Sequence, residues 1–146
     1  MTVKKINYFL LLLFPALITG CLKNSASTNE NTINTPQGNF TGNFTLIHKS
    51  SKGTLDTAYA TITLAMNGTN YVVSGDTTTI QAPSNGTFSA DGSIITFVDA
   101  TVTKRTPLNT PKKHLNGPFL YTYSGPNLHI YGASDTLSYD YKLTGF

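Results

Sequence analysis

The chain has 146 residues, with 10 Lys+Arg against 7 Asp+Glu, one cysteine and no tryptophan. This length suits a single domain, and the basic residues do not form the clustered basic segment expected of a nucleic-acid-binding protein. One cysteine excludes a disulfide within the chain. We therefore expect the fold to depend on a hydrophobic core and a hydrogen-bonded framework.

The first 20 residues have the pattern of a secretory signal peptide. Lys4 and Lys5 precede an apolar run from Phe9 to Ile18, and small residues follow it. The run is too short to cross a bilayer, which needs about 20 apolar residues. Removing residues 1–20 leaves 126 residues (146 − 20), with 8 basic (10 − 2) and 7 acidic side chains, a net charge of +1.

The end of this segment resembles a bacterial lipobox. Ile18 and Thr19 precede Gly20 and Cys21, and Cys21 is the only cysteine of the chain. The resemblance implies cleavage between Gly20 and Cys21, a diacylglyceryl thioether on the cysteine sulfur and an amino terminus acylated with a chain such as palmitate. More than one acyl chain gives stable membrane anchoring. The alternative is an ordinary signal peptide that happens to be followed by a cysteine.

The residues after the cysteine bear on location. Leu22, and not an aspartate, follows Cys21, and no run of acidic residues follows Lys23. By resemblance to the sorting rule of diderm bacteria, we expect a lipid anchor in the outer membrane and a domain that faces the periplasm. Residues 21–37 are rich in Ser, Thr and Asn, so they cannot bury enough apolar surface to offset their ordering entropy. We interpret them as a flexible tether, with a partner-binding tail as the alternative.

From residue 38 onward, apolar and polar residues alternate with a period of two, which indicates strands with one buried face. Asn67-Gly68 and Asp91-Gly92 are typical of two-residue hairpin turns. The pattern predicts eight strands, at about 38–48, 56–66, 69–75, 86–90, 93–98, 117–123, 127–132 and 136–145.

Eight short strands joined by turns can form a sandwich or an up-and-down barrel. Successive hairpins favour the barrel, so we predict an all-β domain at 38–146 with no substantial helix after the signal peptide. The interior of such a barrel holds side chains or one small ligand, and both alternatives stay open here. The positions predicted to line it are Phe40, Phe44, Ile62, Leu64, Phe88, Phe97, Tyr121, Tyr139 and Tyr141.

An irregular segment at about 99–114 separates the fifth and sixth predicted strands. It contains two prolines and four basic residues: Lys104, Arg105, Lys112 and Lys113. It is either a solvated connection or a flap with a basic rim over one barrel mouth, because loops of this length are often functional.

Patterns that would indicate catalysis or metal binding are lacking. His48, His114 and His129 are far apart in the sequence, and neither an HxH or HExxH motif nor a second cysteine is present. Asp99 and Asp140 would form a paired acid site only if the fold brought them together. There is no Gly-x-Ser-x-Gly elbow. We therefore expect neither an enzyme nor a bound cofactor or metal.

Two segments of the domain resemble a known family. Gly38-Asn39-Phe40 is similar to the Gly-x-Trp that opens the first lipocalin strand, and 115–121 with 125–128 is similar to the closing hairpins. On these motifs, residues 38–146 resemble the small lipocalin-like (calycin-type) lipoproteins of the Bacteroidetes. The resemblance implies a non-catalytic, lipid-anchored barrel that binds a small apolar or amphipathic ligand. The alternative is a protein-interaction or hydrolase-inhibitor module that uses exposed loops, notably 99–114.

Overall fold

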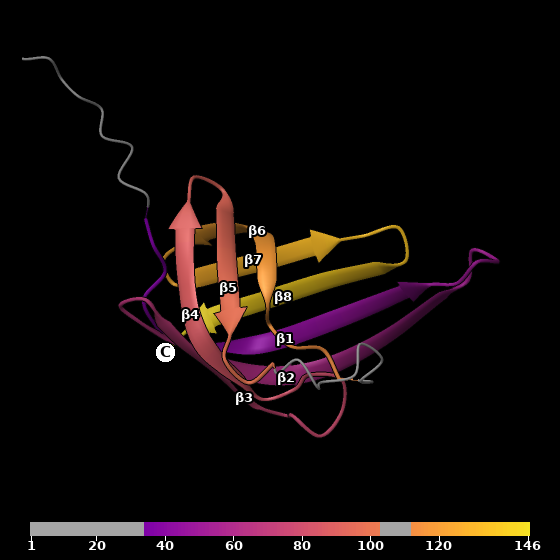
Figure 1. Cartoon of the computed structure of the whole chain (residues 1–146), viewed down its shortest axis with the longest axis horizontal. Coiled ribbons are helices and arrows are strands. Elements are labelled where there is room, and N and C mark those ends of the chain that lie inside the picture. Colours follow the sequence, from indigo (N-terminus) through magenta and orange to yellow (C-terminus); the bar gives the residue numbers. More distant parts are fainter. Residues whose placement is uncertain (1–33, 103–111) are drawn as a thin grey trace, which may run out of the picture. The chain divides into compact units, whose positions relative to one another are not determined.

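Eight antiparallel strands form a closed barrel in the computed structural model, which describes residues 34–102 and 112–146 (Figure 1). The predicted signal peptide, Gly20, Cys21, Lys104 and Arg105 lie outside the described residues. The strands are β1 (Gly38–Lys49), β2 (Leu55–Asn67), β3 (Asn70–Gly75), β4 (Ser84–Asp91), β5 (Ile94–Asp99), β6 (Gly117–Ser124), β7 (Asn127–Ala133) and β8 (Leu137–Gly145).

Barrel closure depends on β1, which pairs with both β2 and β8. Each of the other strands pairs with its neighbours in the sequence, so the up-and-down topology is confirmed and the sandwich is excluded. The strands begin and end within two residues of their predicted bounds. The described residues contain no helix, and hence none long and apolar enough to span a membrane.

Two hairpin turns differ from their prediction by one residue. Asn67 and Asp91 are the last residues of their strands, so the central turn residues are Gly68-Thr69 and Gly92-Ser93. Gly68 has φ = +61° and Gly92 has φ = +58°, while no other residue type among those described has a positive φ. A glycine with positive φ at the first central position is typical of a type II′ turn, which matches the twist of the flanking strands.

Alternate residues of each strand face the barrel interior, as predicted. Phe44, Ile62, Leu64 and Tyr141 have no exposed surface, and Phe40, Phe88, Phe97 and Tyr121 are buried beside them, with Tyr139 half-buried. A side chain with no accessible surface borders no void that could hold a water molecule. At these positions the interior is therefore a packed core.

Aromatic rings connect strands that are adjacent or one strand apart around this core. Phe44 on β1 stacks on Tyr141 of β8 with ring centroids 4.3 Å apart. Phe97 on β5 meets Tyr71 of β3 edge-on at 4.9 Å and Phe119 of β6 at 6.1 Å. Offset and edge-to-face ring pairs add about 0.5–1.5 kcal/mol each beyond the apolar surface that they bury. The rings therefore reinforce the association of strands that are adjacent or one strand apart in the barrel.

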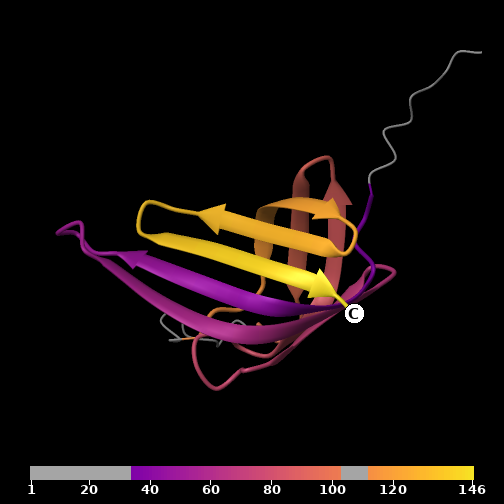
Figure 2. The same ribbon diagram turned by 180° about the vertical axis from the view of Figure 1, so that it is seen from behind.

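The two ends of the barrel differ in the length of the connections between strands. Tight turns after β2, β4 and β6 form one end, called here the hairpin end, where Gln37 at the end of the predicted tether bonds both backbone polar groups of Gly68. The longer connection 76–83 lies at the other end, called here the loop end, together with the described parts of the β5–β6 connection, 100–102 and 112–116. In Figure 2, the β1–β2 hairpin projects past the neighbouring strands on the loop-end side.

Segments 76–83 and 112–116 pair with each other across the loop end. Gln81 and Lys113 form a parallel bridge: the Ala82 amide donates to the Lys113 carbonyl, and the Lys113 amide donates to the Ile80 carbonyl, at 2.9 and 2.7 Å. The hydroxyl of Tyr141 donates to Oε1 of the fully buried Gln81 at 3.1 Å. These bonds satisfy polar groups that would otherwise be buried without partners.

The buried tyrosines make the barrel less stable at alkaline pH. Burial raises the pKa of Tyr141, and burial followed by the Asp99 charge raises the pKa of Tyr71, both above the ordinary value of 10.0. An unfolded tyrosine ionises near pH 10. Stability is therefore fully present below about pH 10 and is lost as the pH rises toward the folded pKa, because only the unfolded chain releases the proton.

The free energy of unfolding of the wild type should fall between about pH 8 and about pH 11. We predict that it falls by about 1.4 kcal/mol less in Tyr141→Phe. Urea unfolding of both proteins at the two pH values measures the difference. Phe44→Leu is the control, because it weakens the core without removing a titrating group and should keep the wild-type pH dependence. An unchanged alkaline loss in Tyr141→Phe would contradict the prediction.

Candidate functional site

The barrel wall opens between β6 and β7. β6 pairs with β5 from Gly117 to Leu120 and with β7 from Leu120 to Ser124. Beyond the Leu120–Tyr131 pair, β7 continues to Ala133 beside β8 alone. The start of β6 and the end of β7 are therefore neighbours without backbone hydrogen bonds, and a hydrogen-bonded wall is replaced there by side chains.

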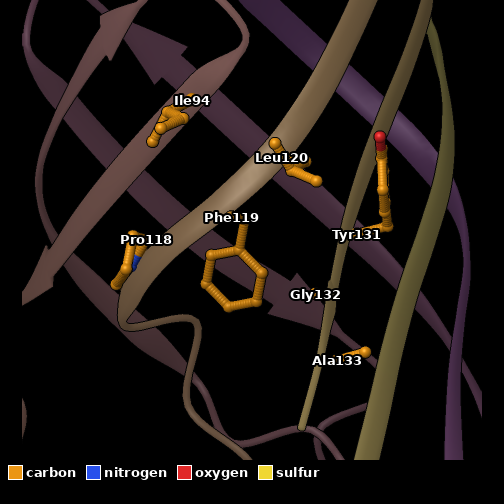
Figure 3. Close-up of a pocket in the computed structure, with 7 residues that line it drawn as sticks. All are labelled: Ile94, Pro118, Phe119, Leu120, Tyr131, Gly132 and Ala133. Carbon is orange, nitrogen blue, oxygen red and sulfur yellow. The ribbon is translucent and has the colours of Figure 1, made fainter.

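The Phe119 ring fills this opening. Gly132 lies at an inward position of β7, two residues after Ile130, and a Cβ built on it would lie 3.0 Å from Cδ1 of Phe119. Figure 3 shows the ring in the gap between β6 and the strand that carries Tyr131, Gly132 and Ala133. The missing side chain of Gly132 thus gives the ring its place, as expected of a strand glycine at a close approach.

An apolar hollow of about 380 Å³ lies on the outer side of the opening. Its walls include outward-facing Ile94, Leu120 and Tyr131, which are directly opposite one another on β5, β6 and β7. These side chains are 46, 42 and 38 % exposed. Four further residues complete the lining, namely Pro118, Phe119, Gly132 and Ala133. The volume is in the range of small-molecule sites.

A polar hollow of about 250 Å³ adjoins the apolar hollow, with which it shares its Pro118, Phe119, Gly132 and Ala133 lining. Its remaining lining residues are Lys113, His114, Asn116, Ser134 and Tyr139. One hollow is thus lined by apolar side chains, the other carries a lysine, a histidine and hydroxyl groups, and Phe119 belongs to both. We call the two together the wall site.

The histidine of the polar hollow is held by a buried carboxylate. Nδ1 of His114 lies 2.7 Å from Oδ2 of Asp99, whose side chain has no exposed surface, while that of His114 is 20 % exposed. The other carboxylate oxygen, Oδ1, accepts bonds from the Thr101 amide at 2.7 Å and the Thr101 hydroxyl at 2.6 Å. With Nδ1 bonded to Asp99, Nε2 is the ring nitrogen left for a molecule in the hollow.

The other polar groups of this hollow differ in their surroundings. Burial raises the pKa of Tyr139, which keeps its hydroxyl neutral. Among the described residues, no acidic side chain forms an ion pair with the ammonium of Lys113. Lys112 points elsewhere, since its ammonium donates to the Thr77 carbonyl at 2.6 Å. The polar hollow therefore presents positive charge from Lys113 and a hydrogen-bonding ring from His114.

A second histidine–aspartate pair lies on the outer face of β7 and β8. Nε2 of His129 is 2.5 Å from Oδ1 of Asp140, Lys142 lies 3.2 Å from the other oxygen, and the His129 ring stacks on Tyr131. The His129 and Asp140 side chains are 39 and 30 % exposed. His129 thus lies on the outer face of the barrel, and Asp140 lies beside it. Asp99 and Asp140 each have a histidine partner and do not form an acid pair.

The sequence-predicted site residues that the structure describes lie in the core and at the loop end. Those predicted to line the barrel are in the core, and Tyr139 also reaches the polar hollow. Of the predicted basic loop, Lys112 and Lys113 lie at the loop end. Sequence reasoning missed the wall site. Its clearest signal was Gly132, a glycine inside a strand, whereas nothing in the sequence links Asp99 to His114, which is 15 positions away.

Comparison of the chain with protein-family models, with curated proteins and with solved structures found no match. In the part of the chain that the structure describes, no three His, Cys, Asp or Glu side chains gather as metal ligands would. The geometry of the wall site is therefore the basis for the functional proposal.

We predict that Asp99→Asn lowers the free energy of unfolding by about 3 kcal/mol, because it removes a buried carboxylate that is bonded to both His114 and Thr101 and places an amide donor against one of them. The matched control is Asp140→Asn, which breaks a partly exposed pair and should cost less than about 1 kcal/mol. Urea unfolding near neutral pH measures both. Equal losses in the two variants would show that burial does not distinguish the pairs.

Proposed function

We propose that this chain is a lipid-anchored, non-catalytic binding module of the cell envelope, and that its wall site binds a small amphipathic molecule. The observation that carries the proposal is the junction of the two hollows at Phe119. The apolar hollow offers Ile94, Leu120 and Tyr131 to a hydrocarbon or ring, while the polar hollow offers charge and hydrogen bonds to a head group. Apolar walls with a few placed polar groups are typical of ligand sites.

The wall site is a better place for the ligand than the barrel interior. The ring-rich interior positions are occupied by packed side chains: Phe44, for example, has no exposed surface and stacks on Tyr141. A ligand there would have to displace core side chains, and emptying such a position costs several kcal/mol. At the wall site, apolar surface is already exposed, so binding would remove it from water without disturbing the core.

The proposed anchor and location rest on the sequence. The lipobox pattern that ends at Cys21 supports lipidation, and Leu22 supports the outer membrane, with the domain facing the periplasm. The closed eight-stranded barrel is the fold expected of the lipocalin-like lipoproteins of the Bacteroidetes, so it supports that proposed kinship. A lipid anchor would hold the wall site near a supply of amphipathic molecules.

A binding role is also a better fit than catalysis. The groups bonded to His114 are Asp99 and Thr101, both on its Nδ1 side, and no described hydroxyl is bonded to Nε2 as a nucleophile would be. The alternative, a protein-interaction module using 99–114, depends on a segment most of which lies outside the described residues. The wall site therefore carries the proposal.

We predict that Leu120→Gln weakens the binding of decanol about fivefold, a loss of roughly 1 kcal/mol from reduced apolar contact. Amide NMR titration measures the affinity, with shifts expected at Leu120, Tyr131 and Gly132. The matched control is Val72→Gln on the outer face of β3, where Val72 is 49 % exposed and does not line the wall site. Absence of saturable shifts at the wall site would refute the proposed function.

We predict that Cys21→Ser abolishes incorporation of labelled palmitate and releases the protein from the outer-membrane fraction, because the sulfur that takes the diacylglyceryl group is gone. Membrane fractionation after metabolic labelling measures both effects in the native cell. Thr19→Ser keeps a small residue before the cleavage site and should be labelled like the wild type. Labelled Cys21→Ser protein would rule out this anchor.

A further inference from the structure

We infer that the wall site selects amphiphiles whose head group is negatively charged, with Lys113 and His114 as the residues that bind the head. This inference rests on the proposed function and narrows it to one charge class. The carrying observation is the charge around the polar hollow: a lysine and a histidine line it, and none of the described residues that line it is acidic.

The surroundings of Lys113 leave its ammonium able to bind an anion in the hollow. Lys113 is half-buried, and its backbone is fixed by the parallel bridge to Gln81, so its position beside the hollow is set by the fold. Its ammonium has no acidic partner among the described side chains, whereas the Lys142 ammonium pairs with Asp140. An anion in the polar hollow would supply the missing partner, and charge-assisted bonds of this kind are stronger than neutral ones.

His114 is oriented for the same task. A protonated imidazole has two donors, so its Nδ1–H can bond to Asp99 while its Nε2–H bonds to an anion in the hollow. Asp99 lies behind the ring with no exposed surface, and its Oδ1 is occupied by both donors of Thr101. Asp99 is therefore a positioning residue: its charge is turned toward His114 and away from the hollow, so an anion meets the ring first.

The remaining groups around the hollow are compatible with an anion. Asn116 contributes its side chain, whose Oδ1 accepts the Asp99 amide at 3.0 Å, which turns its amide nitrogen to other partners. The pKa of Tyr139 is raised by burial, so its hydroxyl stays a neutral donor. The hydrocarbon of the same molecule would lie across Phe119 in the apolar hollow.

The test compares three probes with ten-carbon chains and different heads: decanoate, decanol and decyltrimethylammonium. Amide NMR titrations use the unit Thr32–Phe146, which contains every strand that the structure describes, after its β-rich circular dichroism and cooperative unfolding are shown to match those of the full chain. The decanoate result is then repeated on the full chain. We expect decanoate to bind at least tenfold more tightly than either other probe, with shifts at Lys113, His114 and Phe119.

Matched variants assign the selectivity to the proposed residues. Lys113→Met keeps the apolar stem and should weaken decanoate binding about tenfold while leaving decanol binding unchanged; Lys142→Met is its control. His114→Gln should weaken decanoate binding about fivefold; His129→Gln, which removes the other aspartate-bonded histidine, should not. Decanoate should also shift the side-chain ¹⁵N signals of His114 and leave those of His129 unchanged.

The outcomes separate the two proposals. If all three probes bind the wall site equally, or if Lys113→Met weakens decanoate and decanol alike, the charge selectivity is wrong and the amphiphile-binding function stands. If no probe produces saturable shifts at the wall site, the proposed function fails and the selectivity fails with it. If His114→Gln destabilises the unit, Lys113→Met alone decides the inference, because its backbone contacts are retained.

Discussion

The pairing of β1 with both β2 and β8 is the constraint from which the rest of this structure follows. Closure gives every described strand two neighbours, and it fixes which residues face inward through a register that runs unbroken from Phe40 to His48 along β8. A one-residue slip of this register would turn the inward rings to solvent. Stacking of Phe44 on Tyr141, which lie opposite each other in the register, makes that slip costly.

Packing inside the closed barrel explains why the wall opens between β6 and β7. The interior near β6 must accommodate Phe119, whose ring contacts Phe97, Tyr139 and Tyr141. A side chain at Gly132 would compete for that space, so the glycine and the ring together set the distance between β6 and β7. The wall site is thus a consequence of core packing, and the ring that fills the opening belongs to the core on one side and to both hollows on the other.

Much of the fold could be predicted from the sequence because period-two alternation is a local signal. Phe40 and Phe44, or Tyr139 and Tyr141, identify the inward face without knowledge of their partners. The turn at Gly68 was placed one residue early, because the sequence does not show whether Asn67 ends the strand or begins the turn. The wall site was not predictable, since it depends on β6 exchanging one neighbour for another at Leu120, a property of strand length and direction and not of residue type.

The polar groups of the wall site are placed by one local pattern, the alternation along β5, and by one long-range contact, the bond between Asp99 and His114. Asp99 continues the alternation of β5 inward past Phe97, so its carboxylate is carried into the protein by strand geometry. A buried carboxylate needs hydrogen-bond partners, and Thr101 and His114 supply them from the two sides of the β5–β6 connection. The position of His114 is therefore fixed by its bond to Asp99. Because the chain must then enter β6 beside the opening, the histidine that bonds to the buried carboxylate also lines the polar hollow, with Nε2 as its second ring nitrogen.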